Sequence, residues 1–184
     1  MPELRRYGGA DELPRDLEGQ VRSLLQAEWP APGGEAGGPL VAPRWHPTHF
    51  ILAEGGMVWS YARTVWARVI HSGRGSKLYG LGDVVTAPDL RGSGHGSSVV
   101  REATAHVRSD HEADAALLLT GRELEAFYRR GGWEAVPELE VRADEYDEHN
   151  RGGILPMMLF LSASARRVRA GFQASPLVLP GDEW

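Results

Sequence analysis

The feature that most constrains the fold of this chain is an abrupt change of pattern within DVVTAPDLRGSGHGSSVV, residues 83–100. A β-rich run ends near Pro88, a turn with three glycines in five residues follows, and an apolar run with helical spacing comes next. Glycine inside a helix or strand costs about 0.5–1 kcal/mol relative to alanine, so three together indicate a use for backbone that carries no side chain. The segment therefore predicts a strand that passes through a glycine-rich turn directly into a helix.

The residues before this turn predict one helix and three strands. Apolar residues recur at intervals of three and four from Leu13 to Leu25, which predicts a helix that stops near Trp29. HFILA and MVWSYARTVWARVI then flank the turn EGG, and LYGLGDVVTA follows the turn HSGRGSK. Runs of β-branched and aromatic residues between glycine turns predict a meander of three antiparallel strands.

The residues after the glycine turn predict alternating helices and strands. Apolar residues share one face of a helix over residues 99–107, and AALLLT is typical of a strand buried on both faces. GRELEAFYRR predicts a second helix with Leu124, Phe127 and Tyr128 on one face, and ILPMMLFL and SPLVLP predict further strands. The expected fold class is α/β (α+β), a mixed and mostly antiparallel sheet flanked by helices, in a single domain over residues 1–184.

Composition and charge exclude several classes of function. The net charge of −5 argues against a nucleic-acid binder, which usually needs a basic stripe. The chain has no cysteine, which excludes disulfide scaffolds, thiolate metal sites and a covalent cysteine intermediate. MPELRRYGGADELP lacks the apolar stretch of a secretory signal, and no apolar run approaches the ~18 residues of a membrane span. We therefore expect a cytoplasmic protein with neither nucleic acid nor membrane as a partner.

The glycine turn is suited to hold a phosphate. The N–H groups in the first turn of a helix have no intrahelical acceptor, the helix dipole adds positive potential, and Arg91 supplies a positive charge. The pattern is not a P-loop, because no lysine follows the glycines and Lys77 is the only lysine of the chain. It is not the dinucleotide fingerprint either, since Gly92, Gly94 and Gly96 give Gly-x-Gly-x-Gly. The glycines alone agree equally well with a solvated turn.

The residues that flank the turn resemble a known family. DVVTAPDLRGSGHGSSVV resembles motif A of the GCN5-related N-acetyltransferases (the GNAT superfamily), in which Arg/Gln-x-x-Gly-x-Gly/Ala begins a helix after a strand and a Pro-containing turn. LEAFYRRGGWEAV resembles the second hallmark of that family, a helix with Phe-Tyr followed by glycine and a strand. The two segments occur in the expected order, with the apolar strand ALLLT between them.

Within that family, the chain is most similar to the aminoglycoside 2'-N-acetyltransferase group. It shares with that group the segment RRGGW, an extension after LPMMLFL and an ending of Asp-x-Trp. One position departs from the group, because Gly82 stands where the group has a glutamate at the base of the fourth strand, and Asp83 follows. In a regular strand this offset of one residue turns the carboxylate to the opposite face.

The resemblance implies acetyl-CoA as cosubstrate. Its pyrophosphate would lie on the N–H groups of the glycine turn, and backbone groups of the preceding strand would hold the pantetheine and the thioester. The cofactor-binding residues implied in this way are Val84, Val85, Thr86, Arg91, Gly92, Ser93, Gly94, His95 and Gly96. An amine would attack the thioester carbonyl directly, because the chain has no cysteine to carry the acetyl group.

Two proton transfers in such a reaction need catalytic residues. Asp83, beside the motif, is the candidate base for the attacking amine and a candidate substrate-binding residue, although an acid at the end of a strand is an equal reading of it. The resemblance implies that Tyr128 donates a proton to the leaving CoA thiolate, whereas its spacing alone favours a core aromatic residue. Further candidate bases are Glu28, Glu35, Glu54 and the terminal carboxylate.

Acidic and aromatic residues elsewhere are candidates for binding the acceptor. Trp184 with its carboxylate, and the acidic segment ADEYDEHN, would attract a cationic amine, although a frayed terminus and a solvated loop are the ordinary expectations. The tryptophans that would line an acceptor pocket or, more simply, pack in the core are Trp59, Trp66 and Trp133. His46 and His49 have a spacing that suits a metal, but no ligand cluster accompanies them, so we expect no metal.

The sequence thus predicts an N-acetyltransferase that moves the acetyl group of acetyl-CoA to a primary amine of a small molecule, such as an aminoglycoside-like polycation. The alternatives are acetylation of a protein or peptide amine, and noncatalytic binding of acyl-CoA by a sensor module. The expected partner is the small-molecule amine, and a homodimer is a further candidate assembly.

Overall fold

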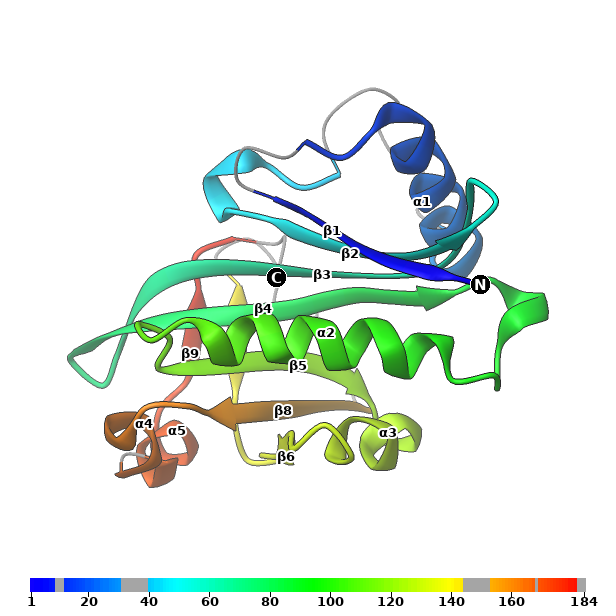
Figure 1. Ribbon diagram of the computed structural model, residues 1–184. Helices are drawn as coiled ribbons and strands as arrows, with labels where there is room; N and C mark the ends of the chain where they lie inside the picture. Colours follow the sequence, from blue (N-terminus) through cyan, green and yellow to red (C-terminus); the bar gives the residue numbers. More distant parts are fainter. Residues whose placement is uncertain (9–11, 31–39, 144–152, 168, 182–184) are drawn as a thin grey trace. The chain divides into compact units, whose positions relative to one another are not determined.

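Runs of β-rich sequence between glycine turns build a mixed α/β fold, whose elements are labelled in Figure 1. The strands are β1 (Glu3–Gly8), β2 (Thr48–Glu54), β3 (Met57–His71), β4 (Arg74–Thr86), β5 (Ala115–Gly121), β6 (Glu134–Ala135), β7 (Val141–Ala143), β8 (Ile154–Phe160) and β9 (Leu177–Leu179). The helices are α1 (Arg15–Glu28), α2 (His95–Ser109), α3 (Glu125–Arg129), α4 (Ala163–Arg167) and α5 (Arg169–Ala174). Short 3-10 turns are η1 (Pro43–Trp45), η2 (Pro88–Leu90) and η3 (Arg122–Leu124).

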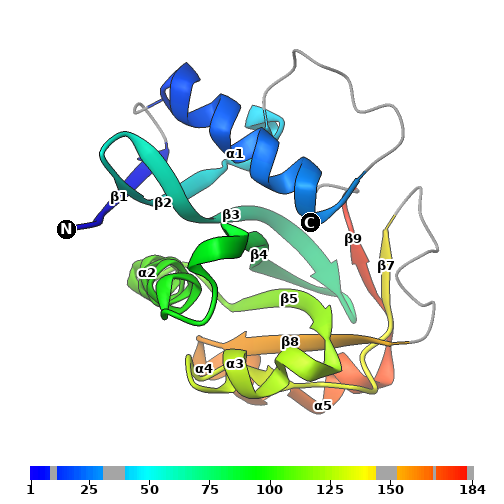
Figure 2. The same ribbon diagram turned by 90° about the vertical axis from the view of Figure 1, so that its right-hand side faces the viewer.

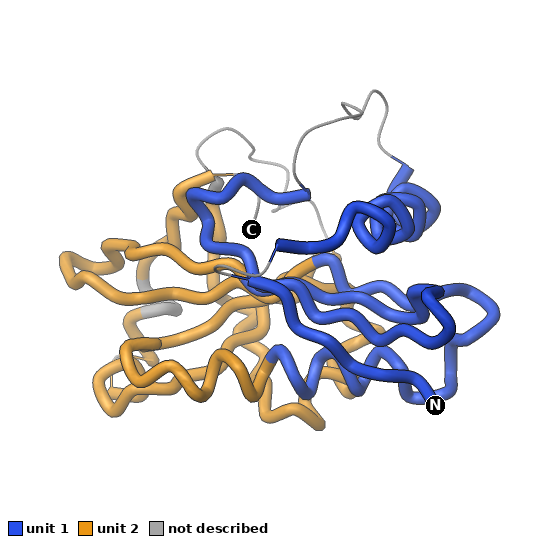
Figure 3. The backbone as a smooth tube through the Cα atoms, turned by 45° about the horizontal axis from the view of Figure 1, so that its top comes forward, with its two compact units in different colours: residues 1–64, 83–103 blue, residues 65–82, 104–184 orange. Residues whose placement is uncertain are grey.

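The described residues divide into two compact units (Figure 3). The computed structural model describes residues 1–8, 12–30, 40–143, 153–167 and 169–181. Unit 1 is formed by residues 1–64 and 83–103, and unit 2 by residues 65–82 and 104–184. Strands β3 and β4 and helix α2 run through both units.

Antiparallel strands β1, β2 and β3 form the sheet of unit 1. Gly55 and Gly56 join β2 to β3 with φ values of 59° and 79°, the two-residue turn with left-handed backbone that EGG predicts. Strand β1 pairs with β2 along its whole length and was not predicted. None of the residues in its sequence ELRRYG is buried, so this edge strand lacks the alternating burial that marks a strand in a sequence.

Helix α1 covers one face of the unit 1 sheet, as its periodicity predicts. Its Leu17 and Val21 are buried in one cluster with Ile51 of β2, Tyr61 of β3 and Val85 of β4. The helix ends at Glu28, and the N–H of its C-cap residue donates to a carbonyl of the last turn, next to the predicted stop at Trp-Pro. This cluster fixes the strands that carry the candidate site.

Unit 2 combines two parallel pairs with antiparallel strands (Figures 1 and 2). Strand β5 pairs with β4 in parallel from Leu78–Ala115 to Gly80–Leu117, and on its other side it pairs antiparallel with β8. Strand β6 extends the sheet beyond β8, and β7 and β9 form a separate parallel pair. Residues 115–118 of β5 are buried, as expected for AALLLT.

The helix predicted over GRELEAFYRR is shorter in the structure, because a 3-10 turn takes up residues 122–124. Leu124 lies in the 3-10 turn before α3 and is 43% exposed, so the predicted common face of Leu124, Phe127 and Tyr128 is wrong at its first residue. Tyr128 itself is 6% exposed and packs edge-to-face against Phe127. A helix of five residues has too few turns to carry a longer apolar face.

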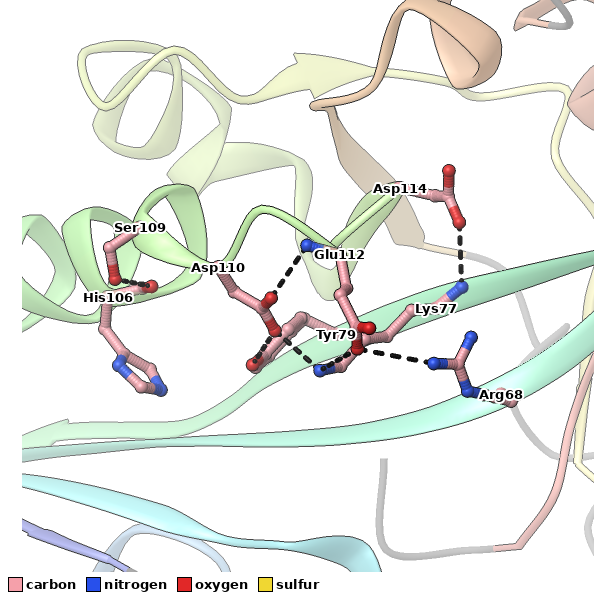
Figure 4. A network of polar contacts seen from close by, with 8 residues as sticks. All are labelled: Arg68, Lys77, Tyr79, His106, Ser109, Asp110, Glu112 and Asp114. Atoms are coloured by element: carbon pink, nitrogen blue, oxygen red, sulfur yellow. Dashed lines mark hydrogen bonds and ion pairs between the residues drawn. The ribbon is translucent and has the colours of Figure 1, made fainter.

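A network of charged groups ties β4 to the segment between α2 and β5 in unit 2 (Figure 4). The Lys77 ammonium lies 4.1 Å from the ring centre of Trp66 and 2.6 Å from Oδ2 of Asp110. The Tyr79 hydroxyl donates to the same oxygen at 2.8 Å, and the N–H of Glu112 donates to Oδ1 at 2.9 Å. Both oxygens of Asp110 are therefore used within the fold.

The fold class is the predicted one, a mixed α/β arrangement of mostly antiparallel strands flanked by helices. Within the part of the chain that the structure describes, no helix is both long and apolar enough to cross a membrane.

Candidate functional site

The glycine turn between β4 and α2 adopts the backbone conformation that requires glycine. Gly92 and Gly94 have φ values of 78° and 83°, in the left-handed region where an L side chain is strained. A Cβ built at either residue would meet no atom within 4 Å, so the backbone angle and not crowding demands glycine in the free protein. The turn thus keeps open space beside its backbone.

Helix α2 begins directly after this turn. The N–H of Ser98 donates to the carbonyl of Gly94 at 3.1 Å, the first bond of the helical pattern. The N–H groups of His95, Gly96 and Ser97 precede that bond, so helical geometry gives them no acceptor within α2. The helix has 15 residues, and its dipole places positive potential at this end. These groups suit an anion such as a pyrophosphate.

Arg91 is held beside the turn by two partners in unit 1. Its Nε donates to the carbonyl of Thr86 at 3.1 Å, and its guanidinium forms an ion pair with Glu28 at the end of α1. The Arg91 side chain is 50% exposed, so it remains accessible from solvent. Glu28, one of the candidate bases, is engaged in this pair.

At the end of β4, some backbone N–H and C=O groups point away from the neighbouring strand β3. The buried Ser60 hydroxyl donates to the carbonyl of Val85 and lies 2.9 Å from the Thr86 hydroxyl. Because the polar groups of successive strand residues point to opposite edges, those of Val84 and Thr86 point away from β3. Of the three predicted backbone contacts, the carbonyls of Val85 and Thr86 are therefore already bonded within the fold, to Ser60 and Arg91.

Two further predicted cofactor-binding residues, Ser93 and His95, lie in and directly after the glycine turn. Ser93 is exposed within the turn, and the His95 ring lies 5.0 Å from the ring of Trp59. Trp59 thus packs against the start of α2. In unit 2, Trp133 is buried and donates its ring N–H to Thr104, and Trp66 lies under Lys77, so both have the structural contacts of core residues.

Asp83 has an irregular backbone. Its φ of 54° is left-handed, so the alternation of faces in a regular strand does not hold at this residue. The one-residue offset between Gly82, which stands at the glutamate position, and Asp83 therefore does not by itself decide on which face of the sheet the Asp83 side chain lies. Its side chain is 27% exposed, and its Oδ2 accepts from Nε of the buried Arg63 on β3. No other described residue bonds this carboxylate.

His49 and Tyr61 lie on the same face as Arg63. His49 Nδ1 and the Tyr61 hydroxyl are 2.8 Å apart. Burial lowers the pKa of His49 to about 4, and the charge of Arg63 contributes to the shift. Burial likewise raises the pKa of Tyr61 far above its ordinary value. Both side chains are therefore neutral near pH 7. Buried and bonded to Tyr61, His49 has the contacts of a core histidine.

Arg63 was missed by the sequence analysis. A cation between the apolar residues of YARTV, in a strand expected to be buried, is the signal that could have found it.

Tyr128, the candidate proton donor, belongs to unit 2. Burial raises the pKa of Tyr128 to about 12, although the Thr120 side chain opposes the shift. The phenol is therefore protonated at neutral pH, which is the form that donates.

The remaining candidates have other partners or lie outside the described residues. Glu54 pairs with the amino group of Met1. Glu35, Trp184 and most of the acidic segment ADEYDEHN lie outside the described residues. Over the described part of the chain, no group of three or more His, Cys, Asp or Glu side chains is placed to hold a metal ion.

The sequence matches the acetyltransferase (GNAT) family over residues 19–133, more than half of the chain. An acyl-CoA N-acyltransferase from Pseudomonas aeruginosa is 23% identical, with a TM-score of 0.60 over 86% of this chain and 99% of that one. A GNAT family acetyltransferase from Brucella melitensis, solved with acetyl-CoA, is 20% identical, with a TM-score of 0.56 over 98% and 94%. The YhbS protein of Escherichia coli, solved with CoA, is 14% identical, with a TM-score of 0.58 over 99% and 90%. No curated protein matches the sequence.

Proposed function

The chain belongs to the acetyltransferase (GNAT) family, and on that premise we propose that it transfers the acetyl group of acetyl-CoA to a primary amine of a small molecule. The proposal treats both units as one domain, since the family match extends through both. It retains the cytoplasmic location expected from the sequence.

Acetyl-CoA is the cosubstrate of the family, and two of the relatives above hold acetyl-CoA or CoA. The observation that carries the proposal is the pair of left-handed glycines, Gly92 and Gly94, that lead into the N-terminus of α2 beside Arg91. Their N–H groups and the guanidinium would bind the pyrophosphate, and the outward backbone of Val84 and Thr86 would hold the pantetheine.

The transfer is direct. The amine nitrogen loses a proton and attacks the thioester carbonyl, the new N–C bond replaces the C–S bond, and the CoA thiolate takes up a proton. We assign Asp83 to the amine, which it would bind and whose proton it would receive or pass to water. We assign the Tyr128 hydroxyl to the thiolate, toward which a protonated phenol can donate.

The acceptor is proposed to be a polycation of the aminoglycoside kind. The resemblance of RRGGW and of the chain ending to the aminoglycoside 2'-N-acetyltransferases supports this class, and the net charge of −5 favours a cationic ligand. Asp83, whose side chain is 27% exposed, is the acid of unit 1 that we assign to meet it.

The test is release of CoA thiol from acetyl-CoA with aminoglycosides, polyamines, amino acids and peptides as acceptors. We expect release with small polycations, whereas release with peptides alone would favour protein acetylation. Acetyl-CoA at about 100 times its Kd should stabilise the protein by about 2.7 kcal/mol, and no thermal shift would remove the central hypothesis.

The variant Tyr128→Phe separates an enzyme from an acyl-CoA sensor. Turnover should fall about a hundredfold with acetyl-CoA affinity unchanged, because only the proton donor is lost. Tyr79→Phe is the matched control, since it removes a hydroxyl from the Asp110 network and should leave turnover unchanged. Acetyl-CoA binding with no thiol release from any acceptor would indicate a sensor.

A further inference from the structure

Arg63 is a buried cation without a direct part in the proposed reaction. Its side chain is 8% exposed, against 27% for Asp83, which it contacts through Nε. We infer that Arg63 is a positioning residue, which orients the Asp83 carboxylate so that its other oxygen binds the cationic nitrogen of the acceptor. The inference rests on the proposed amine acetylation and adds to it a residue that acts only through Asp83.

The sheet of unit 1 fixes the side chain of Arg63. The register of β2 and β3 places His49 opposite Arg63 and Ile51 opposite Tyr61, so these four side chains share one face. Ile51 and Tyr61 are buried in the cluster beneath α1. Arg63 therefore approaches Asp83 from the interior of the unit, and its guanidinium defines where the carboxylate lies.

Two polar neighbours of Arg63 on the same face carry no charge near pH 7. His49 and Tyr61 are neutral and bond to each other. The Asp83 carboxylate lies against Nε of the guanidinium and supplies a negative charge to it.

Asp83 has bonding capacity that a purely structural counter-ion would not keep. Asp110, the partner of Lys77, accepts from three donors with both of its oxygens. Asp83 accepts through Oδ2 alone from the residues described, and its carboxylate is partly open to solvent. It directly precedes residues 84–86, which are proposed to hold the pantetheine, so a nitrogen bound to Oδ1 would lie beside that segment.

The first experiment measures binding of spermidine and of an aminoglycoside by calorimetry, with CoA bound to the protein. Asp83→Asn and Arg63→Met should each weaken amine binding about tenfold or more, the effect of losing a charge-assisted hydrogen bond. Arg63→Lys should weaken it less. The double variant should bind no worse than Asp83→Asn alone, because Arg63 acts through Asp83. The affinity for acetyl-CoA should stay unchanged in all four.

The matched control is Asp110→Asn, which removes the counter-ion of the other buried cation. It should lower the unfolding temperature and leave amine binding unchanged. The inference is overturned if folded Arg63→Met binds amines as the wild type does, if Asp110→Asn weakens binding equally, or if the wild type binds none of these amines. If Arg63→Met does not fold, Arg63→Gln replaces it with the same expectation.

These binding measurements are independent of turnover. A wild-type protein that binds the amines and releases no CoA thiol overturns the proposed reaction, and the assignment of Arg63 and Asp83 to amine binding still stands.

Discussion

Arg63 in unit 1 and Lys77 in unit 2 are both buried cations paired with an aspartate, but the two aspartates are bonded differently. Asp110 receives hydrogen bonds from a lysine, a tyrosine and a backbone N–H, whereas Asp83 receives one, from Arg63, among the residues described. A buried cation alone therefore does not mark a functional site. We therefore expect the bonding capacity left on its counter-ion to be the better indicator.

The backbone repeats this contrast. Asp83 is one of three non-glycine residues with positive φ in the described chain, and Gly92 and Gly94 follow in the same segment of unit 1. Left-handed backbone costs about 1–2 kcal/mol at an L residue. Asp110 instead lies in a turn that its own hydrogen bonds stabilise. Strain and spare bonding capacity occur together at Asp83, which is the pattern of a binding residue.

The largest expected effect is the loss of stability in Asp110→Ala. This change leaves Lys77 buried with Glu112, at 3.7 Å, as its remaining acid. We expect the free energy of unfolding in urea to fall by about 3–5 kcal/mol. Asp83→Ala should cost about 2 kcal/mol, since one charged hydrogen bond is lost at a more exposed carboxylate and Arg63 has other interactions in the fold. An equal loss in the two variants would break the comparison, because Asp83 would then be a structural counter-ion.

Acid should destabilise the protein first through His49. The pKa of His49 is about 4 in the fold and 6.5 when unperturbed, so between these values the unfolded chain binds a proton that the folded protein does not. The free energy of unfolding should therefore fall by about 3 kcal/mol as the pH drops from 6.5 to 4. Urea titrations across this range measure the slope, and His49→Gln should flatten it. A slope unchanged in the variant would assign it to other groups.

Further acidification should then act through Asp110. Burial by itself would raise the pKa of Asp110, but the hydrogen bonds from Lys77, Tyr79 and the Glu112 N–H outweigh it and lower the pKa from 3.8 to about 2. The stability from this network is complete above pH 3.8 and is lost toward pH 2, by about 2 kcal/mol. Asp110→Asn should remove the slope in this window, and a slope that persists in the variant would count against the network.

The smallest expected effect distinguishes two glycines of unit 1. Gly94→Ala should lower the free energy of unfolding by about 1 kcal/mol and weaken acetyl-CoA binding, because its φ is 83°. Gly19 is exposed within α1, and a Cβ there meets nothing within 4 Å. Gly19→Ala should stabilise by about 0.5–1 kcal/mol and leave binding unchanged. If both substitutions change the free energy of unfolding in the same direction, backbone strain at Gly94 does not explain the difference between the two glycines.

Local sequence patterns predicted α1, the β2–β3 hairpin and the glycine turn before α2. Helical periodicity and left-handed turns depend on neighbouring residues, so they can be read directly. The Arg63–Asp83 pair joins residues on two strands that only the folded sheet brings together. The face of Asp83 was argued from the alternation of a regular strand, which its left-handed backbone interrupts. Edge strand β1 was missed because none of its residues is buried.

The position of Lys77 has a practical consequence for chemical labelling. It is the only lysine in 184 residues, it is 7% exposed, and its ammonium is paired with Asp110 and covered by the Trp66 ring. The folded chain thus presents no exposed lysine amine to succinimidyl esters, aldehyde cross-linkers or reactive thioesters. Because its single lysine is buried, the folded protein offers almost no lysine amine that bound acetyl-CoA could acetylate by accident.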